Sequence, residues 1–165
     1  LISFTCFKFM RCNRVIFEDF RVSLIHDKDL FFGGLLMEML IDFPGGLRVD
    51  AHFGSHTVPT DQPPASAAPM PFELFLASIG TCAGIYVLGF CRQRNLPTQG
   101  IRIIQRNHPA GTGMIEKIDL EIQVPSSFPA QYYDALIRSA ELCKVKKTLD
   151  HPPIFEVKTK VVEAV

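Results

Sequence analysis

The sequence predicts an α+β fold with mostly antiparallel strands. A central segment of eighteen residues, 74–91, carries no charged side chain and is apolar on every side, which is typical of a helix surrounded by other apolar groups. The segments before and after it alternate apolar and polar residues, as half-buried strands do. Strands grouped on either side of helices, instead of alternating with them one by one, are typical of α+β domains.

Composition narrows the classes of function. Hydrophobic residues make up 47% of the 165, which is enough to bury one domain core. Lysine plus arginine equals aspartate plus glutamate, 17 against 17, and this balance argues against a nucleic-acid partner or a charged membrane surface. Five cysteines without a CxxC pair match neither a secreted disulfide framework nor a standard zinc site. We therefore expect a reducing, cytoplasmic location.

The first 36 residues differ from the remainder of the chain. They hold seven of the fourteen phenylalanines and none of the twelve prolines. On one interpretation Met37 or Met39 is the true start and residues 1–36 are a translated leader. On the other, residues 1–36 are a genuine extension that packs on the domain. Both interpretations remain open, and the predicted domain is 37–165.

Three short strands are predicted in the first part of this domain. Residues 39–43 form an apolar run that ends at the turn signal of residues 44–46. Residues 47–53 alternate strictly, and residues 55–60 form a third short strand. Residues 61–71 follow as a proline-rich loop.

The uncharged segment predicts one long helix over residues 72–94. Such a helix is buried in protein or spans a membrane, and Gly80 and Gly84 form a GxxxG pair that favours close helix packing in either setting. Because half-polar strands surround the segment and need an apolar partner, we expect a buried helix and no membrane span. A membrane anchor is the alternative.

The second part of the domain continues with strands and shorter helices. The alternation is cleanest where four apolar residues face four polar ones over residues 117–124. Ser127 has the residue type of an N-cap, with Pro129 in the first turn. The predicted elements are strands at 101–107 and 115–124, a helix from 127 to 142, a short helix at 144–149 and a final strand at 155–161.

Cys82 and Cys143 are the candidate reactive residues. Cys82 lies in the middle of the predicted long helix, and Cys143 lies at a helix junction close to several lysines, a setting that favours thiolate. Cys91 is nine residues from Cys82, about 13 Å along a helix and on its opposite face, so these two thiols cannot form a disulfide. Taken singly, each cysteine is more often a small buried apolar residue than a reactive one.

No metal site is predicted. His52 and His56 are four residues apart, but in a strand that spacing separates them by about 13 Å. The sequence also has no phosphate-binding glycine loop and no serine nucleophile motif.

The residues around both cysteines resemble a known family. The segment Pro71-Phe-Glu-Leu-Phe-Leu-Ala-Ser-Ile-Gly-Thr-Cys82 is similar to the motif at the first cysteine of the OsmC/Ohr proteins, which are osmotically inducible or confer organic hydroperoxide resistance. Leu142-Cys143-Lys-Val-Lys-Lys-Thr-Leu149 resembles the segment at their second cysteine. The resemblance covers roughly residues 39–165. Within the family, the sequence is similar to the OsmC-like branch.

The resemblance implies a fold and a chemistry. Members form an intertwined homodimer in which two antiparallel sheets wrap long central helices. Their first cysteine reduces a hydroperoxide and becomes sulfenic acid, and their second cysteine converts it to a disulfide. An external dithiol, often protein-bound lipoyl, then restores both thiols. This implies Cys82 and Cys143 as catalytic residues, a homodimer, and no metal, haem or flavin cofactor.

Two supporting residues match the family pattern only loosely. The family places an acidic residue ten positions before its reactive cysteine, where this chain has Phe72, and Glu73 comes one place later. In a continuous helix Glu73 would face away from Cys82, leaving a role from a loop or across the dimer. Arg48 is the nearest candidate for the family's activating arginine.

Two classes of function fit this pattern. The first is a thiol peroxidase that reduces organic hydroperoxides. The alternative is a redox-sensing or small-molecule-binding protein of the same fold with little turnover.

Overall fold

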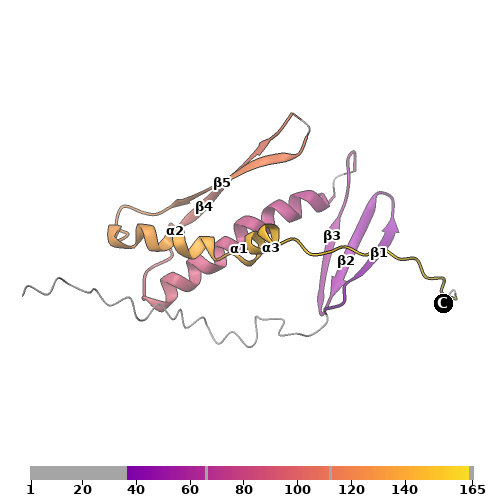
Figure 1. The fold of residues 1–165 in the computed structure, drawn as a ribbon, viewed down its shortest axis with the longest axis horizontal. Helices are drawn as coiled ribbons and strands as arrows, with labels where there is room; N and C mark the ends of the chain where they lie inside the picture. Colours follow the sequence, from indigo (N-terminus) through magenta and orange to yellow (C-terminus); the bar gives the residue numbers. More distant parts are fainter. Residues whose placement is uncertain (1–36, 66, 112, 164–165) are drawn as a thin grey trace, which may run out of the picture. The chain divides into compact units, whose positions relative to one another are not determined.

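A computed structural model describes residues 37–65, 67–111 and 113–163. The predicted leader or extension, residues 1–36, lies outside the described residues. The elements follow in the order of three strands, a long helix, two strands and short helices (Figure 1). This confirms the predicted α+β class with antiparallel sheets.

The first sheet is an antiparallel meander of β1 (Leu40–Gly45), β2 (Arg48–Phe53) and β3 (His56–Thr60), with β2 in the middle. The turn between β1 and β2 contains Gly45 and Gly46 at φ values of 120° and 64°, which side chains with a Cβ rarely adopt. All three predicted strands are present; each starts one residue later than predicted, and β1 also ends two residues later.

Helix α1 (Pro71–Gln93) is continuous over 23 residues, as its uncharged sequence predicts. Pro71 suits the first helical turn, where its missing N–H has no helical partner. Glu73 accepts a hydrogen bond from the Met70 backbone N–H at 2.9 Å and so satisfies one free donor of the helix end. At the other end the chain turns through Asn95 at a φ of 52°.

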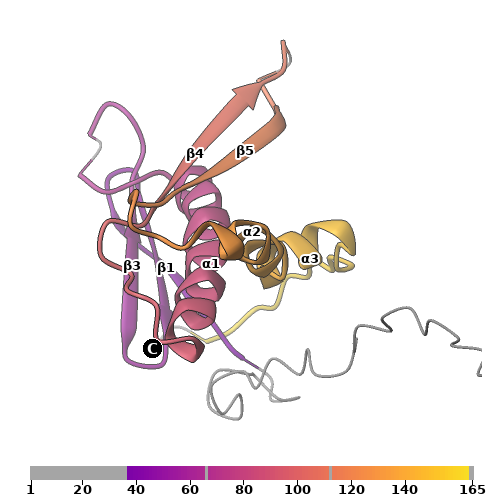
Figure 2. The same cartoon turned by 90° about the vertical axis from the view of Figure 1, so that its left-hand side faces the viewer.

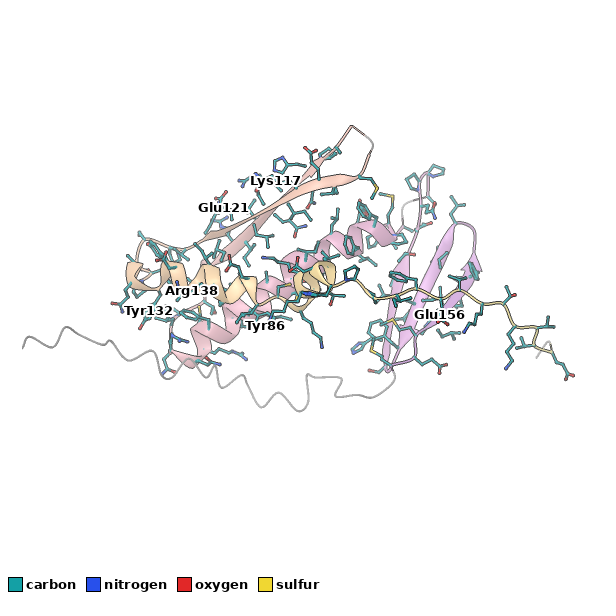
Figure 3. The ribbon with its side chains drawn as sticks, in the orientation of Figure 1. Tyr86, Lys117, Glu121, Tyr132, Arg138 and Glu156 are labelled. Atoms are coloured by element: carbon teal, nitrogen blue, oxygen red, sulfur yellow. The ribbon has the colours of Figure 1, made fainter. Side chains whose placement is uncertain are left out.

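Strands β4 (Arg102–Pro109) and β5 (Ile115–Gln123) form an antiparallel hairpin. Its polar face carries cross-strand ion pairs, including Arg106 Nη1 to Glu121 Oε2 at 2.6 Å, and Figure 3 labels Lys117 and Glu121 there. Its apolar face packs toward α1 and contributes to the core. The alternation of polar and apolar residues in the sequence thus determines which face of the hairpin is exposed to solvent.

The chain then enters a 3₁₀ turn (Ala130–Tyr132), α2 (Tyr133–Glu141) and α3 (Lys144–Asp150), and α2 packs beside α1 (Figure 2). The predicted helix start at Ser127 is wrong. Phe128 is only 3% exposed, and its N–H donates to the Pro125 carbonyl at 2.9 Å. Because this turn is anchored in the core, helical structure begins at Ala130 and not at Ser127.

The core lies between α1, α2 and the β4–β5 hairpin. Side chains from all of these elements are packed in it, including two cysteines. The buried cluster consists of Ala83, Val87, Phe90, Cys91, Phe128, Leu136, Ala140 and Cys143.

The predicted final strand, 155–161, is not formed within one chain. Residues 152–163 carry no strand assignment, and Phe155, Val157 and Val161 are 84%, 95% and 97% exposed. A strand exists only when a neighbour accepts and donates its backbone hydrogen bonds. The alternating side chains are present, but the described part of one chain supplies no such neighbour for them.

One face of α1 also remains uncovered. Phe75, Ile85 and Leu88, which we call the exposed stripe, are 39%, 53% and 38% exposed. The expectation of a helix buried on every side is therefore wrong for a single chain. Within the described residues, α1 is the one helix long and apolar enough to cross a membrane, by length and composition alone.

A glycine permits close contact between α1 and the hairpin. A Cβ on Gly80 would lie 2.6 Å from Gln105 Oε1, and Gln105 Nε2 donates to the Leu76 carbonyl at 3.0 Å. An alanine at position 80 would displace this amide and weaken its hydrogen bond.

We predict that Gly80→Ala changes the free energy of unfolding of the otherwise wild-type protein very little. The helix gains about 1 kcal/mol from alanine, but the lost hydrogen bond costs about as much. In a Gln105→Ala background the clash is gone, so Gly80→Ala should stabilise by about 1 kcal/mol. Urea unfolding of the four proteins in this cycle measures the difference, and equal effects in both backgrounds would contradict the contact.

Candidate active site: a cysteine pair at a helix junction

Cys82 lies halfway along α1 and is half-buried. Helical periodicity places it at the border between the packed face and the exposed stripe, since Ile85 is three residues further on and Ile79 three residues earlier. Ile79 is 2% exposed, whereas Ile85 is 53% exposed. Cys82 therefore has one side in the core and one side accessible.

Cys143 occupies the junction of α2 and α3, as the N-cap residue of α3. Its side chain is fully buried, and Sγ lies 3.8 Å from the carbonyl oxygen of Ile79, one helical turn before Cys82. Its own carbonyl accepts a hydrogen bond from Lys147 N–H at 3.1 Å. Helix α1 and this junction together bring Cys82 close enough to Cys143 for Cys82 to raise the pKa of the Cys143 thiol.

The environment keeps Cys143 protonated. Burial raises the pKa of the Cys143 thiol, backbone N–H groups of Lys146 and Val145 oppose the rise, and the hydrogen bond and charge of Cys82 add to it. The structure thus pairs an accessible sulfur at position 82 with a buried, protonated thiol at 143. Cys6 and Cys12 lie outside the described residues.

Cys91 is a core residue. Its side chain is fully buried in the cluster with Phe90 and Leu136. Burial raises the pKa of its thiol, and the charge of Arg94 only partly opposes this rise. A thiol in this setting is inert, as the sequence predicts for Cys91.

Arg48 stands at the start of β2 and binds a carboxylate of its own strand. Its Nη2 donates to Asp50 Oδ2 at 2.5 Å, and Asp50 is only 5% exposed. The structure pairs Arg48 with Asp50, and no contact with Cys82 is formed within the described part of one chain. The Arg48 side chain is 44% exposed, so part of its guanidinium faces outward.

Glu73 lies in the first turn of the continuous helix and not in a loop. Its carboxylate is exposed and engaged by the Met70 N–H. Nine residues separate it from Cys82, which places the two side chains on opposite faces of α1. In this chain Glu73 acts as a helix cap.

A mainly apolar cavity of about 570 Å³ is lined by sequence neighbours of both cysteines, although neither Cys82 nor Cys143 lines it directly. Helix α1 contributes residues on both sides of Cys82, and α2 and α3 contribute residues on both sides of Cys143. The hairpin closes the cavity with apolar side chains and Glu121. The apolar lining includes Ile79, Ala83, Ile103, Leu120 and Ala140, and the charged lining is Glu121, Glu141 and Lys146.

Sequence patterns did not single out Asp50 or Asp61. Both are buried, at 5% and 2% exposure. Asp61 accepts backbone hydrogen bonds from Ala67 and Gln62, which lower the pKa of its carboxyl together with the charge of Arg48. Alternation places Asp50 on the same face of β2 as Arg48 and His52, and its 5% exposure shows that this face is covered at Asp50.

Metal ligation has no basis in this part of the chain. Across the described residues no group of three or more His, Cys, Asp or Glu side chains is placed to hold a metal ion. The His52 ring instead lies 3.1 Å from the Thr57 hydroxyl and 3.2 Å from the Asp42 carboxylate.

Comparison with known proteins decides the family. The sequence matches the family described as OsmC-like protein over residues 63–158, which is more than half of the chain. The chain belongs to the OsmC-like family. The match includes both Cys82 and Cys143, and the OsmC-like resemblance of their motifs is thereby confirmed. No curated protein matches the chain.

Solved structures support the OsmC-like fold. A Psychrobacter arcticus 273-4 protein, proposed to be an osmotic stress induced and detoxification response protein, matches with a TM-score of 0.59 at 16% identity, over 72% of this chain and 91% of the other. An OsmC-like protein from Mycoplasma pneumoniae matches with a TM-score of 0.59 at 12% identity, over 72% and 90%. At these identities the likeness shows the fold alone.

Proposed function

We propose that this OsmC-like protein is a thiol-dependent peroxidase that reduces organic hydroperoxides. The observation that carries the proposal is the neighbouring pair of an accessible Cys82 and a buried, protonated Cys143. A sulfenic acid needs a second thiol nearby to become a disulfide, and α1 and the α2–α3 junction supply one.

The reaction proceeds in balanced steps. The Cys82 thiolate attacks the terminal oxygen of R–O–O–H, the O–O bond breaks, and the alkoxide takes up a proton to leave as R–OH. Cys82 is then a sulfenic acid. The sulfur of Cys143 attacks the Cys82 sulfur, forming the S–S bond and releasing the hydroxyl with the thiol proton as water. An external dithiol, such as a protein-bound lipoyl group, becomes a disulfide and restores both cysteines.

Each protein group has a defined part in this scheme. The buried Cys143 stays a thiol until the sulfenic acid forms, because burial holds its pKa up. The electrons pass between sulfur and oxygen, so the scheme uses no metal, haem or flavin. It also requires reducing surroundings such as the cytoplasm, where thiols persist.

The apolar cavity favours organic peroxides over hydrogen peroxide. Its lining includes Ile79, one helical turn before Cys82, and isoleucine and leucine side chains of the β4–β5 hairpin. An alkyl or aryl group gains about 25 cal/mol for each Å² of apolar surface removed from water there. Hydrogen peroxide has no such group.

A homodimer completes this account. The exposed stripe borders Cys82, and the residues 154–162 that fail to pair within one chain are extended and strongly exposed. Apolar surface of this kind marks an interaction site, and a second copy offers the same helix face and unpaired sheet edges in return. We place the second copy on the exposed stripe.

A steady-state assay tests the proposed activity. Cumene hydroperoxide and dihydrolipoamide serve as substrates, and Cys91→Ala serves as the control that leaves the cysteine pair intact. The proposal expects turnover by the wild type and the control, and slower turnover with hydrogen peroxide. Absence of turnover with any peroxide and dithiol would favour the alternative, a redox-sensing or binding protein of the same fold.

A further inference from the structure

The two sulfurs of the cysteine pair differ in their access to solvent. Cys143 is 0% exposed and belongs to the same buried cluster as Phe128, Leu136 and Ala140. Cys82 is half-buried and packs against that cluster from outside it. A molecule that arrives from solution can therefore touch the sulfur of Cys82, whereas the core encloses the sulfur of Cys143.

Backbone hydrogen bonds hold Cys143 in this enclosed position. Its N–H donates to the Ala140 carbonyl at 3.3 Å, and its carbonyl accepts from the Lys147 N–H at 3.1 Å. On the side of α1, its Sγ lies 3.8 Å from the carbonyl oxygen of Ile79, which is itself 2% exposed. Because both backbone groups of Cys143 are engaged, exposure of its sulfur requires local opening of the α2–α3 junction.

Access and leaving ability favour different sulfurs when a thiol attacks the disulfide. The attacking thiolate must reach one sulfur, and the other sulfur leaves as a thiolate. Leaving ability disfavours Cys143, because burial raises the pKa of its thiol and the backbone N–H groups of Lys146 and Val145 only partly oppose the rise. This dependence is shallow, about threefold in rate for each pKa unit. A sulfur without exposed surface is attacked only after the junction opens, so access decides the outcome.

We propose that the dithiol that restores the oxidised protein attacks the sulfur of Cys82, and that Cys143 is the leaving thiol. The inference rests on the proposed function, which supplies the Cys82–Cys143 disulfide and the dithiol. Cys82 then meets both the peroxide and the reductant, and Cys143 touches neither of them. Because both reactants use the same sulfur, the alcohol product must leave before the dithiol enters.

The reductive steps balance. One thiolate of the dithiol bonds to the Cys82 sulfur, the Cys82–Cys143 bond breaks, and Cys143 leaves as a thiolate that takes up a proton. The second thiolate of the dithiol then attacks the reductant's own sulfur in this mixed disulfide, and Cys82 leaves as a thiolate. Two electrons pass to the protein, and the dithiol closes to an internal disulfide.

The test uses 2-mercaptoethanol, a small neutral monothiol whose first adduct marks the attacked sulfur. Full-length protein is oxidised with one equivalent of cumene hydroperoxide, or with diamide if the peroxide forms no Cys82–Cys143 disulfide. After brief exposure to 2-mercaptoethanol, exchange is stopped with acid, free thiols are alkylated in denaturant, and mass spectrometry locates the adduct. The earliest samples should carry about tenfold or more adduct on Cys82 than on Cys143, with Cys143 alkylated.

The same oxidised protein in concentrated urea is the control, because unfolding exposes both sulfurs and should reduce the preference to about threefold or less. Equal adducts in the folded protein, or more adduct on Cys143, would overturn the inference. Failure of both oxidants to join the two cysteines would also overturn it, since the pair would then be out of reach. A disulfide that only diamide forms, with the adduct on Cys82, would refute the proposed peroxidase and uphold the attacked sulfur.

Discussion

Replacement of Cys82 by serine is expected to abolish hydroperoxide reduction, with a loss of at least 1,000-fold in kcat/KM. A serine hydroxyl is not ionised at neutral pH and cannot take the peroxide oxygen as a thiolate does. The substitution removes one sulfur from a half-buried site, so folding should be preserved. Consumption of cumene hydroperoxide with dihydrolipoamide measures the loss, and circular dichroism checks the fold.

The matching variant at the second cysteine should behave differently. Cys143→Ser leaves Cys82 able to react once, so sulfenic acid should accumulate at Cys82 and be trapped by dimedone. Turnover with a dithiol should fall while the first oxidation keeps its rate. Rapid oxidation of Cys143 in the Cys82→Ser protein would reverse the assigned roles.

A charge placed on the exposed stripe is expected to dissociate the homodimer. Ile85 is 53% exposed in one chain, and in the proposed dimer Ile85→Asp would bury an unpaired carboxylate at the interface. Such a charge costs several kcal/mol, so the dissociation constant should rise about 100-fold or more. Sedimentation velocity at micromolar concentration measures the change.

Met114→Asp is the matched control for this variant. Met114 is 67% exposed, beside the loop of the β4–β5 hairpin, and an acid there should leave assembly unchanged. A wild-type protein that sediments as a monomer would contradict the dimer, as would Ile85→Asp protein that remains fully dimeric.

Periodicity predicted the local elements because each strand has one solvent-facing side and one packed side, while the long helix has no polar side at all. β5 alternates cleanly, and its strand matches the sequence within one residue. α1 is uncharged over eighteen residues and forms one continuous helix. Patterning of this kind is set by neighbours within a few residues, so it is readable from sequence alone.

Features that depend on distant contacts were not predictable. The start of α2 depends on how Phe128 is anchored in the core, which no local signal reveals. The alternating residues 155–161 have strand propensity, but a strand needs a partner, and residues 37–163 of one chain, as far as the structure describes them, offer none.

In the candidate site, too, some residues could be identified from the sequence and others could not. Motif resemblance identified Cys82 and Cys143, and the fold brings them close enough for Cys82 to raise the pKa of the Cys143 thiol, although 61 positions separate them. Their roles in catalysis stay predictions. The resemblance suggested Glu73 and Arg48 more loosely, and the structure gives both of them local partners, the Met70 N–H and the Asp50 carboxylate.

Mapping of the disulfide formed with one equivalent of cumene hydroperoxide tests the central claim most directly. Full-length reduced protein is treated, alkylated and digested without reductant, and the cross-linked peptides are identified by mass spectrometry. The account predicts a single fast product in which Cys82 is joined to Cys143, while Cys91 remains a free thiol. Oxidation of Cys91 before Cys82, or no thiol reacting faster than free cysteine, would contradict it.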